Sequence, residues 1–202
     1  MKLLELFSGT HSVGNVAKEL GWDVVSLDLQ GADINCDVMT WDYSQYPADS
    51  FDIIWSSPPC ETFSHLRRSW IGRKLKAFGD KTVTREMLDE DMMIRGVPIL
   101  RKTEEIINYF QPKYYFIENP KNGKMKEFVE HRPYVDVDYC QYGFDYRKST
   151  RIWTNLTYEG KRCVCGKAHK SSLGHQDSIN RKTKYRIPPA LIKDLFSTIL
   201  LI

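Results

Sequence analysis

The sequence predicts an α/β fold of the Rossmann-like class, with a mostly parallel sheet that carries helices on both faces. Short apolar runs that read as buried strands alternate with stretches of helical periodicity. The first strand, the first helix and the second strand form a compact βαβ unit. Acidic residues or a cysteine stand just after several of the apolar runs, where open parallel sheets bind their ligands.

The composition indicates one globular domain that spans residues 1–202. The chain has 202 residues, of which 42% are hydrophobic and 27% are charged, as is usual for water-soluble proteins. No apolar segment approaches the length of a membrane-spanning helix. The odd number of cysteines, five, argues against a disulfide framework. We therefore expect a cytoplasmic protein with no membrane partner.

The first βαβ unit is expected to hold an adenosine-containing cofactor. Residues 3–7 read as a strand, and a glycine-containing turn leads into a helix that stops at Gly21. A second strand, residues 23–27, ends in Asp28, whose carboxylate can accept hydrogen bonds from both ribose hydroxyls. The turn lacks the glycine spacing that a dinucleotide pyrophosphate needs. A cofactor without phosphates, S-adenosylmethionine, therefore fits better than a nicotinamide.

A further strand is followed by a cysteine in a position suited to chemistry. Residues 51–55 are apolar, and Pro58 and Pro59 hold the following chain in a stiff extended form. Cys60 is thereby held at the carboxyl edge of the sheet, where a thiolate can act as a nucleophile. A lone cysteine is more often a small buried hydrophobic residue, so this interpretation depends on the rest of the chain.

An acid follows the next strand in the same way. Residues 61–98 are polar and irregular, which predicts a lid or a partly helical insertion. Helical spacing follows over residues 99–110, and the apolar strand 114–117 then ends in Glu118. If the two strands are parallel neighbours, Cys60 and Glu118 lie side by side.

The last part of the chain predicts an antiparallel strand pair and a closing helix. Residues 135–140 alternate between apolar and polar and can pair with residues 151–155. Residues 156–184 are loop-like and basic. The two prolines at 188–189 open an amphipathic helix.

Five motifs occur in order along the chain: Leu6-Phe-Ser-Gly9, Ser57-Pro-Pro-Cys60, Glu118-Asn-Pro120, residues 147–154 and Tyr185-Arg-Ile-Pro-Pro189. On these motifs the chain resembles the DNA cytosine-5 methyltransferase family over nearly its whole length, and most closely its small phage and prophage members. The Pro-Pro-Cys and Glu-Asn strand ends are specific when they occur together. The resemblance implies an S-adenosylmethionine-dependent methyltransferase fold and methyl transfer to C5 of cytosine in DNA.

The chemistry of these residues agrees with that implication. Cytosine C5 can accept a methyl group once a thiolate adds at C6, which is the role expected of Cys60. Glu118 would protonate or hydrogen-bond N3 of the base. The resemblance assigns Arg151, with Arg147 as a second candidate, to the carbonyl edge of the base.

The resemblance also implies a set of cofactor contacts around the carboxyl ends of the first strands. They are Phe7 against the adenine, the backbone of Ser8, Gly9, Thr10, His11, Ser12 and Val13 near the methionine carboxylate, Asp28 on the ribose, Leu29 beside the adenine, Asp37 on the adenine amino group and Pro58 beside the sulfur.

Several residues depart from the family pattern. Glu61 stands where relatives commonly have glutamine, and its carboxylate is expected to disfavour the Cys60 thiolate. His11 and Ser12 stand where many relatives have glycine. Residues 156–184 are too few for a target-recognition domain, so a short basic insert is expected in its place.

Basic residues cluster in two segments that could bind phosphates. Between Lys161 and Arg186 there are eight lysines and arginines and a single acid, and a second cluster follows Cys60. Solvated surface charge is the alternative interpretation. The clusters predict DNA binding without sequence readout, and they leave room for a partner protein that supplies sequence recognition. The residues assigned to nucleic acid are Arg67, Arg68, Arg147, Lys161, Arg162, Lys182 and Lys184.

The insert also contains four potential zinc ligands, Cys163, Cys165, His169 and His175. A metal could stabilise a loop that has no core of its own. The C-x-C spacing is tighter than the usual C-x-x-C, and histidines in a basic loop can also face water or phosphate, so both interpretations stay open.

Two other functions stay open as well. A non-catalytic relative could keep the fold to bind nucleic acid or to stimulate a partner, although the presence of both Cys60 and Glu118 speaks against it. An enzyme that acts on tRNA or on a free nucleotide is compatible with the missing recognition domain.

Overall fold

Seven strands form one sheet in the part of the chain that the computed structural model describes, residues 1–166, 169 and 185–201. The strands are Lys2–Leu6 (β1), Asp23–Asp28 (β2), Ile34–Asn35 (β3), Ile53–Ser56 (β4), Tyr114–Pro120 (β5), Tyr134–Asp138 (β6) and Ser149–Thr154 (β7). Their order is β3-β2-β1-β4-β5-β7-β6, and β7 runs in the opposite direction to the other six strands of this described sheet. The predicted Rossmann-like α/β fold is confirmed.

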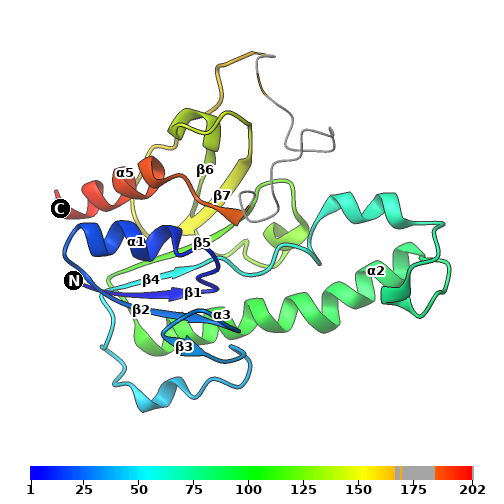
Figure 1. Ribbon diagram of the computed structural model, residues 1–202, viewed down its shortest axis with the longest axis horizontal. Coiled ribbons are helices and arrows are strands. Elements are labelled where there is room, and N and C mark those ends of the chain that lie inside the picture. Colours follow the sequence, from blue (N-terminus) through cyan, green and yellow to red (C-terminus); the bar gives the residue numbers. More distant parts are fainter. Residues whose placement is uncertain (167–168, 170–184, 202) are drawn as a thin grey trace.

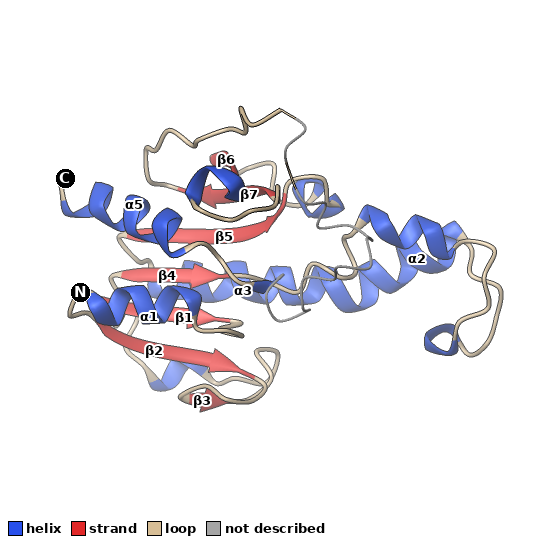
Figure 2. Cartoon of the chain, turned by 45° about the horizontal axis from the view of Figure 1, so that its top comes forward, coloured by secondary structure: helices blue, strands red, loops and turns tan. Residues whose placement is uncertain are grey.

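Helices cover both faces of the sheet, as predicted. Helices α1 (Ser12–Glu19) and α5 (Pro189–Leu200) lie together on one face, and α3 (Val97–Phe110) lies on the other (Figures 1 and 2). The closing helix buries the apolar stripe expected from its sequence, formed by Leu191, Ile192, Leu195, Phe196 and Ile199. Among the helices described, none is long and apolar enough to cross a membrane.

The sheet divides the hydrophobic core into two layers. In β4, Ile53 and Trp55 belong to the layer under α1 and α5, whereas Ile54 belongs to the layer under α3. The same alternation holds in β5, where Phe116 and Ile117 face opposite layers. Both faces are buried, so these parallel strands appear in the sequence as continuous apolar runs.

The helix that precedes β5 is longer than the sequence predicted. A first segment, α2 (Arg85–Asp91), continues through a π-helical turn (Met92–Gly96) into α3. Pro98 has no N–H to donate and would crowd a carbonyl of the preceding turn, so a widened turn just before it relieves the helix. The sequence indicated a helix only from residue 99, because the earlier part extends beyond the sheet and six of its twelve residues from 85 to 96 are charged (Figure 1).

Two further segments complete the surroundings of the site. Residues 61–84 contain two 3-10 helices, His65–Trp70 and Lys76–Phe78, which with α2 confirms the expected partly helical insertion. The predicted antiparallel pair is also confirmed, as β6 and β7. Strand β6 ends before Cys140, which lies in a 3-10 turn, Tyr139–Tyr142.

The order of the strands reverses between β1 and β4, which are neighbours at the centre of the sheet. Such a reversal leaves a crevice at the carboxyl ends of the strands, because the connections on its two sides lead away in opposite directions. The carboxyl ends of β1, β2 and β4 all point toward the end of the molecule that carries α2 (Figure 2).

Candidate active site

Cys60 follows β4, and Glu118 lies near the end of β5, the parallel neighbour of β4 that the sequence predicted. The last residue of β4 lies opposite Ile117 of β5, so the chain reaches both positions at the same edge of the sheet. Asn119 joins the two strand ends, because its buried Nδ2 donates a hydrogen bond to the carbonyl of Pro58 at 2.8 Å. The amide of the Glu-Asn motif therefore holds the segment that carries the cysteine.

The Glu118 carboxylate is buried and contacts two side chains. It is 5% exposed, accepts a hydrogen bond from the Tyr139 hydroxyl at 2.9 Å, and has the Lys148 ammonium 3.5 Å from the same oxygen. Burial and the nearby carboxylate raise the pKa of Tyr139 well above its usual value, so this hydroxyl remains a donor. Both partners come from the connection between β6 and β7, which thus fixes the orientation of the carboxylate.

Cys60 is influenced by charges of both signs. Burial has the largest effect and raises the pKa of its thiol; Lys148 lowers this pKa, while Glu118 and Glu61 raise it. The effect expected of Glu61 on the thiolate is thus confirmed in direction. Sequence analysis missed Lys148, whose only signal was its position within the 147–154 motif.

Arg151 lies on the other face of the sheet from Glu118. It pairs across the strands with Asn119, whereas Glu118 pairs with Ile152, and successive residues of a strand point to opposite faces. Its guanidinium forms two hydrogen bonds with the Asp136 carboxylate, at 2.8 and 3.1 Å, and stacks over the Tyr134 ring. The structure therefore brings Lys148, and not Arg151, to Glu118.

The predicted cofactor loop lies at the carboxyl ends of β1 and β2. Phe7, Gly9 and His11 have left-handed backbone conformations, with φ of 58°, 46° and 53°, which fold the loop tightly. The Asp28 carboxylate accepts hydrogen bonds from the backbone N–H of Gly9 at 2.9 Å and of Leu29 at 2.7 Å. The end of β2 is thereby attached to the glycine turn.

The remaining predicted cofactor residues also surround this loop. Ser12 accepts a hydrogen bond from the backbone N–H of Ile187 at 3.2 Å, so the first and last motifs of the chain meet. Thr10 bonds to Ser12, Val13 begins the buried face of α1, and Pro58 is buried behind Cys60. Asp37 is exposed after β3, and its carboxylate accepts from the N–H of Met39, within its own turn.

Glu5 is a functional candidate that sequence analysis missed. It lies in β1, is 3% exposed, and its two oxygens accept the N–H groups of Val13 at 3.2 Å and Gly14 at 3.1 Å, so it caps α1 from outside the helix. Burial raises its pKa to about 7, against the lowering effect of these hydrogen bonds and of His11. A Cβ at position 14 would lie 2.6 Å from Glu5 Oε2, so a larger residue than Gly14 would require the Glu5 carboxylate to shift.

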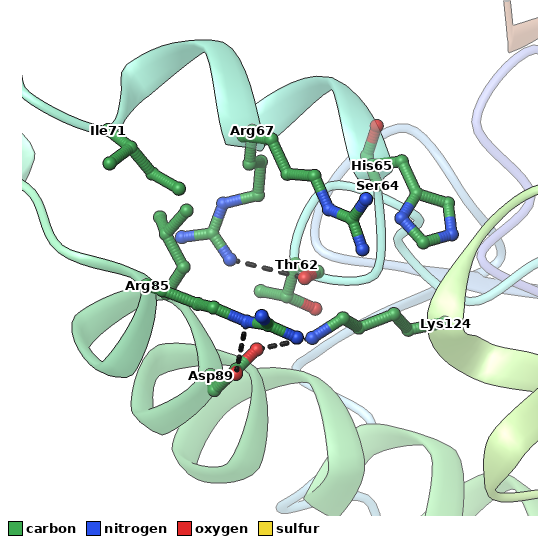
Figure 3. Close-up of a pocket in the computed structure, with 10 residues that line it drawn as sticks. Thr62, Ser64, His65, Arg67, Ile71, Arg85, Asp89 and Lys124 are labelled. Carbon is green, nitrogen blue, oxygen red and sulfur yellow. Dashed lines mark hydrogen bonds and ion pairs between the residues drawn. The ribbon is translucent and has the colours of Figure 1, made fainter.

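A basic cavity of about 210 Å³ opens between the 61–84 segment and α2 (Figure 3). It is lined by Thr62, Ser64, His65, Arg67, Arg68, Ile71, Arg85, Leu88, Asp89 and Lys124. Asp89 is the single acid among these, and both Arg85 and Lys124 reach it. Burial and the positive charges of Arg68 and of nearby lysines lower the pKa of His65. The cavity therefore offers a positive field, and Thr62 in its lining stands two residues after Cys60 in the chain.

Several residues assigned to nucleic acid have partners within the protein. Arg67 is a correction: it is 4% exposed, pairs with Asp91 and lies over Trp70, so it anchors the segment instead of facing a phosphate. Lys161 pairs with Asp194 at 2.8 Å. Both Arg147 and Arg162 pair with Asp138, at 3.2 and 3.1 Å. Arg68 is exposed at the cavity.

Three of the four predicted metal ligands come together. Cys163, Cys165 and His169 lie with Cys140, and the four ligand atoms are all within 4.8 Å of one another. Cys140 was not assigned, because it stands far from the others in the sequence. His175, Lys182 and Lys184 lie outside the residues that the structure describes.

The sheet order and the helices on both faces define a Rossmann-like α/β fold, with a cysteine and a glutamate at neighbouring strand ends. No family model matches the chain. The probable DNA (cytosine-5)-methyltransferase of Frog virus 3 (isolate Goorha) is 39% identical over 217 aligned positions, which cover 96% of this chain and 98% of that protein. The chain belongs to the DNA (cytosine-5)-methyltransferase family.

Solved structures of methyltransferases are similar at lower identity. A variant of Spodoptera frugiperda DNMT2 has a TM-score of 0.47 at 16% identity, covering 81% of this chain and 53% of its own. S. pombe Dnmt2 has a TM-score of 0.43 at 15% identity, covering 80% of this chain and 51% of its own. Entamoeba histolytica EhMeth has a TM-score of 0.47 at 13% identity, covering 78% of this chain and 53% of its own. The chain thus spans about half the length of these solved proteins.

Proposed function

We propose that this protein transfers a methyl group from S-adenosylmethionine to C5 of cytosine in DNA, through a covalent adduct with Cys60. The observation that carries the proposal is the placement of Cys60 and Glu118 at adjoining strand ends of the central sheet. Membership of the family supports the reaction, and the printed name of the viral relative supports DNA as the substrate.

In the first step the Cys60 thiolate attacks C6 of cytosine, a carbon–sulfur bond forms, and electron density moves from the C5–C6 double bond into the ring. Lys148 favours this step, because its positive charge lowers the pKa of Cys60 against the effects of burial and of the two carboxylates. With all these influences together, the pKa of the Cys60 thiol stays above the ordinary value for a cysteine. The thiolate is therefore a minor species at neutral pH in the free protein.

Glu118 stabilises the negative charge that develops at N3 of the base, by donating a hydrogen bond or a proton to that nitrogen. The Tyr139 hydroxyl and the Lys148 ammonium meet on one of its oxygens, which leaves the other oxygen to face the base. A base then removes the C5 proton of the methylated ring, the carbon–sulfur bond breaks, and Cys60 leaves as a thiolate. Arg151 stays a prediction for the carbonyl edge of cytosine, since it would first have to leave Asp136.

The loop after β1 fits S-adenosylmethionine, which supplies the methyl group when bound. The hydroxyl of Ser8 is buried and has no hydrogen-bond partner among the described residues, so a ligand group can satisfy it. Leu29 is 71% exposed beside the Asp28 carboxylate, as expected of a side chain that an adenine would cover. We assign the ribose to Asp28 and the adenine to the space between Phe7 and Leu29.

For the nucleic acid we assign the basic cavity between the 61–84 segment and α2 to a phosphate of the bound strand. The groups available there are Arg68, Arg85, His65 and Lys124. A single catalytic domain with a short basic insert in place of a recognition domain, and a partner protein that supplies sequence recognition, stay predictions. So does a location in the cytoplasm, which would be the host cytoplasm if a virus or phage encodes the chain.

The direct test is to incubate the protein with labelled S-adenosylmethionine and one of four acceptors: duplex DNA, single-stranded DNA, tRNA or dCMP. We expect label in DNA, released as 5-methylcytosine on hydrolysis. Label only in tRNA or only in dCMP would move the substrate to the alternative class. Label in none of the four, with S-adenosylmethionine bound, would indicate the non-catalytic alternative.

A further inference from the structure

A second cluster of reactive side chains lies outside the proposed active site, where the turn after β6 meets the segment after β7. Cys140 comes from the turn, and Cys163, Cys165 and His169 come from the segment. We propose that these four residues form a structural zinc site. The site differs from the one expected from the sequence, since Cys140 takes the place of His175.

The distances fit a tetrahedral ion. With bonds of about 2.3 Å to sulfur and about 2.0 Å to nitrogen, neighbouring ligand atoms of a tetrahedral zinc site are roughly 3.5–3.8 Å apart. All four ligand atoms lie within 4.8 Å of one another, and Cys163 Sγ is 3.0 Å from His169 Nε2. Small rotations of the side chains would close the set around an ion. Three cysteines and one histidine also complete the coordination of a structural zinc, with no position left for water.

The surroundings supply the second layer of contacts that metal sites need. The Gln141 amide donates to Cys165 Sγ at 3.0 Å, and the backbone N–H of Cys163 donates to the buried Asp138 carboxylate at 2.9 Å. Zinc with three thiolates and a neutral histidine carries one net negative charge. Arg147 and Arg162, which both pair with Asp138, lie next to it and can balance this charge.

The site also explains the unusual spacing of the ligands. A C-x-C pair cannot form a closed zinc site by itself, and the remaining cysteine is supplied by a different part of the fold. The ion would link the segment after β7 to the turn after β6. Hydrogen bonds also join these two parts of the chain, such as the one from the Asp138 N–H to the Lys161 carbonyl at 3.0 Å. That turn carries Tyr139, whose hydroxyl holds Glu118. Zinc would thus fix a structural support of the proposed active site.

The test measures metal content and does not depend on activity. The full chain is purified in reducing, chelator-free buffer, and zinc is quantified by plasma mass spectrometry. We expect about one zinc per chain in the wild type, a loss of most of it in Cys140→Ser, and full retention in the matched control Cys36→Ser, which alters a half-buried cysteine outside the cluster.

His175→Ala separates the proposed ligand set from the alternative. Retention of zinc in His175→Ala with loss in Cys140→Ser supports the proposal, and the reverse result overturns it. If Cys140→Ser does not fold, cobalt titration of the metal-stripped wild type replaces it. The visible absorption of a tetrahedral cobalt–thiolate centre is then expected in the wild type and in His175→Ala. A wild type with no bound zinc and no such cobalt spectrum, or with a disulfide among Cys140, Cys163 and Cys165 in its intact mass, contradicts the site.

Discussion

At the scale of single residues, burial has the largest effect on the reactivity of Cys60, and a lysine and two carboxylates modify that effect. Burial makes the thiolate unfavourable, the Glu118 and Glu61 carboxylates add to this, and Lys148 is the one charged side chain among the main influences on this thiol that acts in the opposite direction. Lys148 also touches Glu118. One ammonium group therefore connects the proposed nucleophile with the proposed acid.

Removing this ammonium should slow the reaction at neutral pH. In Lys148→Ala we expect the pKa of Cys60 to rise further, and each additional unit lowers the thiolate fraction about tenfold below that pKa. The rate of Cys60 alkylation by iodoacetamide, and of methyl transfer, should increase with pH in both proteins, with the increase at higher pH in the variant. Lys148→Arg keeps the charge and should keep the wild-type profile. Identical profiles for Lys148→Ala and the wild type would exclude the role.

Glu5 should make stability depend on pH. Its pKa is about 7 in the folded protein, whereas 4.5 is the ordinary value for a glutamate that water surrounds, as in the unfolded chain. Because the folded pKa is raised, the contribution of neutral Glu5 is fully present below pH 4.5 and is lost as the pH rises through about 7, by roughly 3 kcal/mol in all.

Urea unfolding between pH 4 and 8 measures this effect. In Glu5→Gln the free energy of unfolding should no longer fall with pH, although its overall value can shift because a hydrogen bond to α1 is lost. Glu130→Gln, at an exposed position, should keep the pH dependence of the wild type. An unchanged slope in Glu5→Gln would show that another group titrates.

At the scale of elements, the sequence predicted the strands and helices whose apolar pattern is set by the sheet. The strand ends at Cys60 and Glu118 and the stripe of α5 fall in this class, because burial on the sheet dictates both the residues and their spacing. Sequence analysis did not locate the elements that lie outside the sheet, or it predicted them as shorter than they are. The stretch from Arg85 to Gly96 is helical, although it buries only Leu88, Met92 and Gly96, one residue per turn.

The candidate site shows the same division. Cys60, Glu118 and Asp28 could be placed because each follows a recognisable strand. Lys148 and Cys140 could not, since their positions depend on how the β6–β7 connection folds back on the sheet. The burial of Arg67 was hidden for a similar reason: its partner Asp91 lies in the helix that the sequence did not indicate.

The π-helical turn before α3 should be needed for the position of Cys60. A Cβ on Gly96 would overlap Thr62 Oγ1 and lie 3.1 Å from the Phe63 ring, in the segment that follows the cysteine. In Gly96→Ala we expect a loss of roughly 1–3 kcal/mol in stability and a larger relative loss of methyl transfer, with S-adenosylmethionine affinity unchanged.

Met93→Ala is the matched control for this variant, because Met93 belongs to the same turn and is exposed. It should have wild-type transfer. Wild-type transfer in a folded Gly96→Ala protein would show that the turn does not position the cysteine segment.

At the scale of the whole molecule, the described basic residues of the insert differ from those that line the cavity. Those of the insert, such as Lys161 and Arg162, have aspartate partners and help to hold the fold. Those of the cavity, such as Arg68, lie around one aspartate, Asp89. Phosphate contacts supply affinity without sequence readout, so the basic residues of the cavity should dominate non-specific DNA binding.

Arg68→Gln should weaken binding to all DNA sequences about equally and reduce the slope of log affinity against log salt by about one. Lys161→Gln should change the slope little. Single-stranded or mismatched DNA should bind at least as well as duplex, because base flipping costs a few kcal/mol in a duplex. Fluorescence anisotropy across a salt series measures all three. Strong selection of one long site by the isolated chain would contradict this account.

The central claim is that Cys60 forms a covalent bond with C6 of cytosine. The most direct measurement uses DNA that contains 5-fluorocytosine, in which C5 carries no proton that a base can remove, so the adduct cannot be resolved after methyl transfer. With S-adenosylmethionine present, we predict a denaturant-resistant protein–DNA complex that peptide mass spectrometry locates at Cys60. The complex should form with Cys36→Ser and be absent with Cys60→Ser. An enzyme that methylates ordinary DNA but traps no such complex, or traps it at another residue, would contradict the mechanism.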